Sequence, residues 1–292
     1  MSARRLGEEV LAGRHGTGND PHLFAIADAA QNRALPDAVN TGTSACLMEV
    51  GPESDWARNA PHLVALPSFD PEHESWRWIL RNGPRRPCVT VIGATVGFAA
   101  LLRSLRGLAE VKLPDGDEMF FAFWDPAILG SLVGQPDDTT LHVGGPILTG
   151  EQKTSFLHGI TGWWYWDRAG SLHTIDVSRV TGAEARVPFE LLQTQVDDLV
   201  EASVPDHIRY HIELNQPQLF EGMPDIQRYA FVQRSLAAGR STGLEGMGDL
   251  VNYACACLIY RDRMERDLII TTLLGRVKRG MIDFDTAMKE LP

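Results

Sequence analysis

The stretch Leu105 to Leu129, LRGLAEVKLPDGDEMFFAFWDPAIL, contains the patterns of two strands, a tight turn and a helix start. Val111 and Leu113 alternate with a lysine, and Asp115-Gly116 supplies residues that tolerate positive φ, so the chain is predicted to reverse there in a hairpin. Met119 to Trp124 then returns as an almost wholly apolar run. Such a run is typical of a strand that is covered on both faces.

A helix is predicted to begin where this second strand ends, at Trp124-Asp125-Pro126. An aspartate can accept hydrogen bonds from the free N–H groups of a first helical turn. A proline directly after it has its φ angle preset and has no N–H group to leave unpaired. We therefore expect Asp125 to be the N-cap and Pro126 the first residue of a helix that runs through Ile128 and Leu129.

Outside this stretch, strand and helix patterns alternate as far as Asp176. Strands are predicted at His22 to Ala27, Ala45 to Val50, His62 to Leu66 and Cys88 to Ile92. Helices are predicted at Ser54 to Asn59, from Asp70-Pro71 to Gly83, and at Thr95 to Leu105. Gln135 to Gly150 has the composition of a loop, and Gly162 to Asp167 with Leu172 to Asp176 predicts a second hairpin.

The pattern changes after Pro188, where apolar residues recur at helical spacing to the end of the chain. Helices are predicted at Phe189 to Ala202, Pro205 to Leu214, Pro224 to Ala238, Leu244 to Tyr260, Arg266 to Lys278 and Phe284 to Leu291, the last capped by Asp283. The expected fold class is therefore α+β. A mixed α/β lobe with a mixed or antiparallel sheet, residues 1–187, precedes an all-helical lobe, residues 188–292, with the boundary near Arg186 to Pro188.

Composition excludes several classes of protein. Lys and Arg total 27 against 38 Asp and Glu, and the net charge of −11 disfavours broad attraction to nucleic acid or to an anionic membrane. No segment approaches the roughly 20 apolar residues of a membrane span, and none near the start resembles a signal peptide. We expect a cytoplasmic protein without membrane insertion. The cysteines, Cys46, Cys88, Cys255 and Cys257, lack zinc-site spacing and are interpreted as small buried residues.

One pattern points to a hydrolase, because Gly239 to Gly243 fits the G-x-S-x-G sequence of a nucleophile elbow around Ser241. That elbow requires a strand before the serine and a helix after it, whereas Ser241 lies between two predicted helices. The hydrolase order also places the histidine after the serine, and here the last histidine is His211. We interpret Gly239 to Gly243 as a helix-to-helix connection and keep a Ser241 hydrolase as the alternative function.

A second enzymatic alternative is a metal site at His207 and His211, which are four residues apart in a predicted helix and could share a face with Glu213. The segment between them, Ile-Arg-Tyr, lacks the glutamate that a zinc hydrolase places beside its first histidine. We interpret the pair as partly exposed helix histidines.

Two further features are interpreted as packing. Gly93 to Gly97 follows a strand and opens a helix, where a phosphate-binding loop would lie, but it has neither the lysine of a P-loop nor a G-x-G-x-x-G sequence. Trp163, Trp164 and Trp166 could stack on a sugar or base, or form a protein-binding surface. The core needs large apolar groups, so burial is the favoured interpretation.

These elements together resemble the type VI secretion adaptor proteins known as Tap or Tec, from about His22 to Pro146. The resemblance is a succession of LFAIADAA, APHLVALP and LLRSLRGLAEVKLPDGDEMFFAFWDPAIL. The matching positions are Asp28, Pro61, Leu63, Val64, Leu102, Arg103, Leu105, Gly116, Phe123, Trp124, Asp125 and Pro126. The sequence departs from the family at His62, where an aromatic residue is usual, and at Ala122 and Ala127, where arginine is frequent.

The resemblance implies a protein that is not an enzyme and that needs no cofactor, metal or catalytic residue. It implies a chaperone or adaptor in the cytoplasm of a Gram-negative bacterium, with a secreted effector as partner. The adaptor would help to load that effector onto the VgrG spike or a PAAR-type tip domain. The resemblance also nominates a structural motif and candidate interaction site, which consists of Asp28, Trp124, Asp125 and Pro126.

Overall fold

The computed structural model describes residues 5–10, 21–32, 35–39, 42–48, 54–177 and 188–291. The contacts between residues divide the chain into two compact units, Met1–Ala202 and Ser203–Pro292. This division lies inside a long helix, α8 (Gln193–Asn215). The boundary predicted near Arg186 to Pro188 precedes that helix. Of these three residues, 186 and 187 lie outside the described ranges.

A six-stranded sheet forms the centre of the N-terminal unit, with the order β2-β3-β1-β4-β7-β8. Its strands are β1 (His22–Asp28), β2 (Ser44–Cys46), β3 (Pro61–Leu66), β4 (Val89–Ala94), β7 (Ile160–Trp166) and β8 (Leu172–Ile175). Every neighbouring pair is antiparallel. The predicted α+β class, with an antiparallel sheet before a helical region, is confirmed.

Both faces of this sheet are buried, because alternate residues of each strand point to opposite sides. In β7, Trp163 and Tyr165 belong to one apolar cluster, whereas Trp164 and Trp166 belong to a cluster on the other face. All four side chains are at most 3% exposed, so the predicted packing role of the tryptophans is confirmed. The near-continuous apolar runs of these strands follow from this double coverage.

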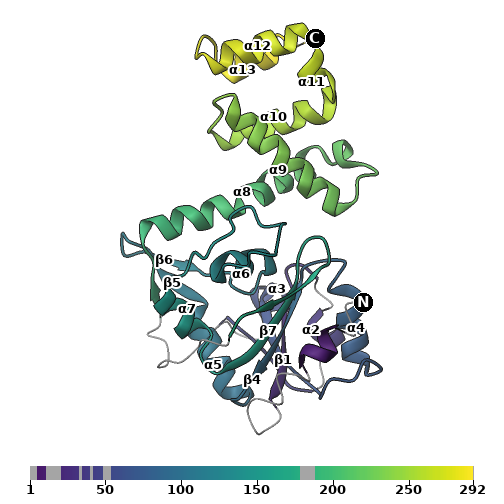
Figure 1. Ribbon diagram of the computed structural model, residues 1–292, viewed down its shortest axis with the longest axis vertical. Coiled ribbons are helices and arrows are strands. Elements are labelled where there is room, and N and C mark those ends of the chain that lie inside the picture. The colour runs from purple at the N-terminus through teal and green to yellow at the C-terminus, as the bar shows by residue number, and fades with distance from the viewer. Residues whose placement is uncertain are drawn as a thin grey trace. The chain divides into compact units, whose positions relative to one another are not determined.

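Helices cover each face of the sheet, as Figure 1 shows. On one side the cluster includes residues of helix 5–10, of α2 (Leu35–Val39) and of α4 (Glu74–Asn82). On the other side it includes residues of α5 (Phe98–Leu108), α6 (Pro126–Val133) and α7 (Gly150–Phe156). A short helix, α3 (Asp55–Asn59), has Ser54 as its N-cap.

Two helix starts differ from the prediction. The helix expected from Asp70-Pro71 begins only at Glu74, with His73 as N-cap, because the Asp70 side chain instead accepts a hydrogen bond from the backbone N–H of Glu72 in a preceding turn. The helix expected from Thr95 begins at Phe98, since the backbone N–H of Thr95 donates to the carbonyl of Gly159. In each place another hydrogen bond, local at Asp70 and to a distant segment at Thr95, competes with the first helical turn.

The predicted hairpin around Gly116 is confirmed, with φ of 95° at that glycine between β5 (Glu110–Lys112) and β6 (Glu118–Phe120). The second strand is shorter than expected from Met119 to Trp124. It ends at Phe120, after which the backbone turns so that Phe121 and Phe123 both enter the core. Apolar character in this run therefore reflects a buried turn as well as a strand.

The third strand of this small sheet, β9 (Phe189–Glu190), was predicted to be helical. It pairs in parallel with β5, and the backbone N–H of Leu191 donates to the carbonyl of Lys112. The long-range pairing outweighs the local helical pattern of Phe189 to Ala202, so α8 begins at Gln193. Two residues are too few to give a strand signal in the sequence.

The C-terminal unit is helical, as predicted. Its elements after α8 are the 3₁₀ turn η1 (Pro217–Phe220), α9 (Asp225–Ser241), α10 (Met247–Tyr260), α11 (Arg263–Arg266), α12 (Leu268–Lys278) and α13 (Phe284–Lys289). Asp283 caps α13, and its side chain accepts a hydrogen bond from the N–H of Thr286. The separate helix predicted from Pro205 is wrong, because α8 continues through that buried proline. Within the described ranges, no helix is long and apolar enough to cross a bilayer.

Candidate functional site

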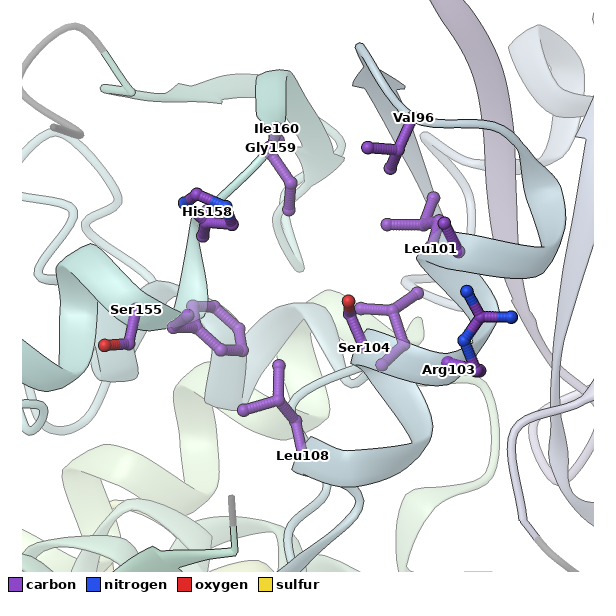
Figure 2. A pocket seen from close by; sticks show the side chains of 12 residues that line it. Val96, Leu101, Arg103, Ser104, Leu108, Ser155, His158, Gly159 and Ile160 are labelled. Atoms are coloured by element: carbon purple, nitrogen blue, oxygen red, sulfur yellow. The ribbon is translucent and has the colours of Figure 1, made fainter. Parts of the chain in front are cut away.

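A cavity of about 480 Å³ opens between α5 and the segment that joins α7 to β7. It is lined by Val96, Ala100, Leu101, Arg103, Ser104, Leu105, Leu108, Ser155, Phe156, His158, Gly159 and Ile160. Figure 2 shows Arg103 and Ser104 on the α5 side and Ser155 and His158 on the other side. Its volume lies in the range of about 300–1,000 Å³ that is usual for ligand pockets.

The floor and the mouth of this cavity differ in chemistry. The floor consists of Leu101, Leu105, Leu108, Phe156 and Ile160, each at most 7% exposed and all part of the main apolar cluster. At the mouth, Arg103, Ser104 and His158 are exposed. The lining residues, all within the described ranges, include no aspartate or glutamate. The cavity therefore offers apolar contact at depth and positive or polar groups at its edge.

Hydrogen bonds fix α7, which forms one wall. Thr149 and Gln152 make a reciprocal capping box at its start. The Lys153 ammonium group donates to the carbonyl of Val133 at the end of α6, at 2.7 Å. The Gln152 amide also donates to the carbonyl of Glu190 in β9. These contacts hold the wall in place, so the cavity is a property of the folded scaffold.

The family-like motif at Trp124-Asp125-Pro126 lies behind the cavity floor. The Phe123 ring packs edge to face on Phe156, with centroids 5.7 Å apart, and on Trp124, at 5.3 Å. Asp125 is the N-cap of α6, as predicted, and its Oδ1 accepts a hydrogen bond from the N–H of Ala127 at 2.9 Å. The motif thus supports Phe156, which lines the cavity, while Trp124 itself is only 8% exposed.

Asp28, the other nominated residue, lies at the end of β1 and is 6% exposed. Its Oδ1 accepts a hydrogen bond from the N–H of Ala30, which stabilises the turn after the strand. Burial raises the pKa of Asp28, and backbone hydrogen bonds from Ala30 and Gln31 and the charge of Arg86 oppose that rise. Asp28 and Asp125 therefore stabilise two different turns, and neither lines the cavity.

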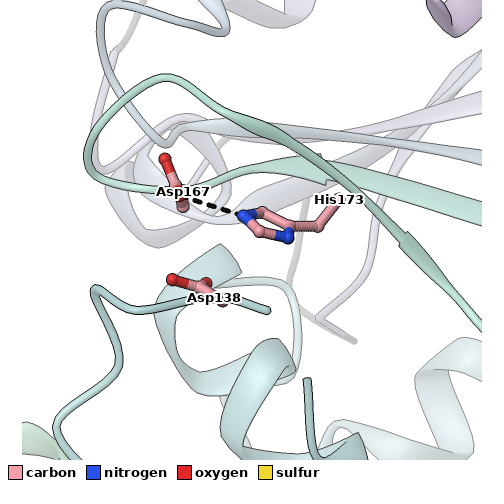
Figure 3. Close-up of side chains that lie close together, drawn as sticks. All are labelled: Asp138, Asp167 and His173. Atoms are coloured by element: carbon pink, nitrogen blue, oxygen red, sulfur yellow. Dashed lines mark hydrogen bonds and ion pairs between the residues drawn. The ribbon is translucent and has the colours of Figure 1, made fainter. Parts of the chain in front are cut away.

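A buried polar cluster, formed by Asp138, Asp167 and His173, is the second site with unusual chemistry (Figure 3). Its three potential ligand atoms lie within 4.8 Å of one another. His173 Nε2 is 2.9 Å from Asp167 Oδ2, and its Nδ1 is 3.3 Å from Asp137 Oδ2, which is close enough for an ion pair but lacks hydrogen-bond geometry. The His173 ring also stacks on Tyr165, at 5.3 Å between centroids.

The charge state of the cluster follows from its contacts. Burial alone would lower the pKa of His173, but the hydrogen bond to Asp167 and the charges of Asp138, Asp167 and Asp137 outweigh it and raise that pKa. Burial raises the pKa of Tyr165, as does the neighbouring Asp138. The hydrogen bonds and charge around Asp137 lower its pKa, although its partial burial acts in the opposite direction.

The donor set of this cluster is of a kind that binds divalent metals, but its oxygens are already used. Asp138 accepts hydrogen bonds from the N–H and hydroxyl of Thr140 through Oδ1 and from Tyr165 through Oδ2. Asp167 Oδ1 accepts from the N–H groups of Ala169 and Ser171. A metal ion would have to displace the proton between His173 and Asp167. We therefore interpret the cluster as a structural link between the loop at Asp138 and the β7–β8 turn.

The residues of the enzymatic alternatives are not brought into an active site. Ser241 is the last residue of α9, is exposed, and donates a hydrogen bond from its hydroxyl to the carbonyl of Ala238. A helix precedes it, so the geometry of a nucleophile elbow is not formed. His207 and His211 are both exposed on α8, and within the described ranges they belong to no group of three potential metal ligands. Glu213 instead lies 3.2 Å from Arg228.

Sequence patterns had not indicated the cavity or the buried polar cluster. Arg103 and Leu105 were noted as part of the resemblance, and Gly93 to Gly97 as a tight connection, but His158 and Phe156 had no role in any motif. The closest signal was the apolar face of α5, whose Leu101 and Leu105 follow helical spacing. That spacing predicts burial of these leucines but does not indicate a cavity beside the helix.

A family model described as a domain of unknown function, DUF4123, matches residues 23–142. The matched segment runs from β1 through α5, the β5–β6 hairpin and α6 into the loop that follows α6. Neither the curated proteins nor the solved structures that were compared gave a match.

Proposed function

We propose that this protein is a non-enzymatic adaptor that binds a secreted effector of a type VI secretion system. In this proposal it keeps the effector in a state that can be exported and helps to load it onto the VgrG spike or a PAAR-type tip. The observation that carries the proposal is the family match over residues 23–142, because DUF4123 is known as a domain of the Tap type, associated with effector adaptors.

The arrangement of the matched segment supports binding more than chemistry. Its strand-turn-helix motif buries Phe123 and Trp124 and uses Asp125 for a helix cap, so the polar group of the motif is satisfied within the fold. Such a motif acts by shaping a scaffold. Beside it lies the cavity, with a buried apolar floor and an exposed mouth, which suits contact with a side chain of another protein.

An adaptor of this kind would bind apolar surface that an effector exposes before export, and so reduce its aggregation. Binding must be reversible, because the effector has to leave with the secretion machinery. Apolar contacts combined with a charged rim meet that requirement, since they provide affinity and selectivity without a covalent step.

The experiment is co-expression with the product of the effector gene that neighbours this chain's own gene. We expect the soluble yield of the effector to rise and the two proteins to co-purify through size-exclusion chromatography. An effector encoded beside an unrelated secretion cluster is the control, and its yield should not change. Unchanged yield of the cognate effector together with a lack of co-purification would contradict the proposal.

A second measurement addresses the enzymatic alternatives directly. Metal content of the purified chain and hydrolysis of general ester substrates are compared between the wild type and Ser241→Ala. Equal turnover in both proteins and no stoichiometric metal are expected if the protein acts by binding. Turnover that disappears in Ser241→Ala, or one metal ion per chain that is lost with His207→Ala, would favour the hydrolase.

A further inference from the structure

We infer that the cavity between α5 and α7 receives one large apolar side chain of a polypeptide partner, with a carboxylate of the same segment held at the mouth by Arg103 and His158. This inference adds a binding site to the proposed function. Only the identification of the partner as an effector rests on that function. The occupant is thus a short segment in which a residue such as phenylalanine or leucine adjoins an aspartate or glutamate.

The apolar part of the inference follows from the cavity floor. Five buried side chains, from α5, from the end of α7 and from the start of β7, line the cavity and belong to one apolar cluster. Phe156, one of them, is fixed between Phe123 and Trp163, with which it stacks at 5.2 Å. Because these neighbours hold the ring, the floor does not need to rearrange when a side chain enters, which reduces the entropic cost of binding.

The carboxylate follows from the polar groups at the mouth, of which Arg103 carries a positive charge. Arg103 is exposed there on one side and His158 on the other. Within the ranges that the structure describes, neither side chain forms an ion pair, although the chain as a whole carries a charge of −11. Six other arginines do form ion pairs with acidic side chains: Arg5, Arg209, Arg228, Arg263, Arg266 and Arg276. An arginine at the edge of an apolar pocket favours a carboxylate, because its guanidinium group can donate two parallel hydrogen bonds to the two oxygens.

The charge of Arg103 and the net charge of the chain select against other occupants. A basic segment would meet Arg103 without a compensating acidic lining residue. A polyanion such as nucleic acid would be repelled by the net charge of −11 beyond the mouth. A single carboxylate beside an apolar group satisfies both the mouth and the floor, and it is the combination that a polypeptide segment most readily supplies.

The test uses blocked synthetic peptides, which do not depend on the identity of the effector. The first contains a phenylalanine next to an aspartate, the second has asparagine in place of that aspartate, and the third has alanine in place of the phenylalanine. Binding to the full chain is measured by isothermal titration calorimetry. We expect the first peptide to bind about tenfold or more tightly than either of the others, as loss of a charge-assisted hydrogen bond or of a buried ring would require.

Two variants with a matched control place the peptide in the cavity. Ala100→Trp fills the cavity and should abolish binding, whereas Ala99→Trp, at the neighbouring exposed position of the same helix, should leave it unchanged. Arg103→Glu should remove or invert the preference for aspartate over asparagine. If Ala100→Trp fails to fold, as judged by circular dichroism, Ser104→Trp at the exposed mouth takes its place.

The outcomes separate this inference from the proposed function. No binding of the first peptide by the wild type, or equal binding by Ala99→Trp and Ala100→Trp, would overturn the inference even if an effector co-purifies. Specific peptide binding would support the cavity assignment even if the neighbouring effector does not co-purify, in which case the proposed function fails alone. Decanoate is included as a fatty carboxylate, and tighter binding of decanoate than of the peptide would overturn the assignment to a polypeptide.

Discussion

The cavity at Arg103 and the buried cluster at His173 lie in the same unit, and each contains a histidine beside other polar side chains. These side chains are buried in the cluster and exposed at the cavity mouth. In the cluster, Asp138 and Asp167 are both 6% exposed, and each of their oxygens accepts a hydrogen bond from within the chain. At the cavity mouth, Arg103 and His158 are exposed, and neither has an ion-pair partner in the described part of the chain.

The difference shows how a structural polar group is distinguished from one that is available for recognition. A buried group without a partner costs free energy, so a folded chain satisfies it internally, and its removal damages the fold. An exposed group is satisfied by water and is free to exchange that water for a partner. We therefore expect changes in the cluster to alter stability, and changes at the cavity mouth to alter binding.

The largest effect is expected for Asp167→Ala. The change removes acceptors for the N–H groups of Ala169 and Ser171 and leaves His173 without its closest partner. The free energy of unfolding, measured by urea denaturation, should fall by about 3–5 kcal/mol, the usual cost of breaking a buried ion pair. Asp137→Ala, whose side chain is 62% exposed, should cost less than about 1 kcal/mol. Equal losses for both variants would contradict the structural role of the cluster.

A smaller effect is expected from pH, because the pKa of His173 is raised in the folded state by Asp167, Asp138 and Asp137. A group with a raised folded pKa stabilises the fold fully below its unfolded value, which is about 6.5 for histidine, and loses that contribution as pH rises through the folded pKa. The stability difference between wild type and His173→Gln should therefore shrink between pH 6 and pH 9.

Urea denaturation at several pH values measures this dependence. The exposed His158→Gln serves as the control, and its stability relative to wild type should not follow the same trend. A difference between wild type and His173→Gln that grows with pH would show that the histidine is buried neutral.

The cap of α6 is expected to contribute about 1 kcal/mol, the usual value for an N-cap aspartate. Asp125→Ala removes the acceptor for the N–H of Ala127 and should lower the free energy of unfolding by that amount. Asp117→Ala, in the exposed hairpin turn, is the matched control and should be close to neutral. A neutral Asp125→Ala would show that the motif has a role other than positioning α6.

The smallest effect on stability is expected at the mouth of the cavity. Arg103→Ala should change the free energy of unfolding by less than about 0.5 kcal/mol, because the side chain is exposed. A larger loss would mean that Arg103 is a structural residue, and the contrast between the two sites would disappear.

Local patterns predicted much of the N-terminal fold. The hairpin strand with buried tryptophans at Gly162 to Asp167, the positive φ at Gly116 and the Asp125-Pro126 helix start are all properties of a few neighbouring residues, and each appears as expected. Three of the errors have a common cause. At Phe189, at Thr95 and after Phe120, a hydrogen bond or burial that involves a distant segment replaces the local preference.

The candidate sites were less predictable for the same reason. His173 and Asp138 are 35 positions apart and meet because β8 pairs with β7, whose Tyr165 reaches Asp138. Phe156 and Leu101 line one cavity although no local pattern connects them. The sequence by itself determined most element types, the aspartate-proline cap and the acidic charge, because these depend on neighbouring residues or on composition. Only the tertiary structure decided which polar groups are satisfied and where a gap remains, because both depend on how distant segments pack.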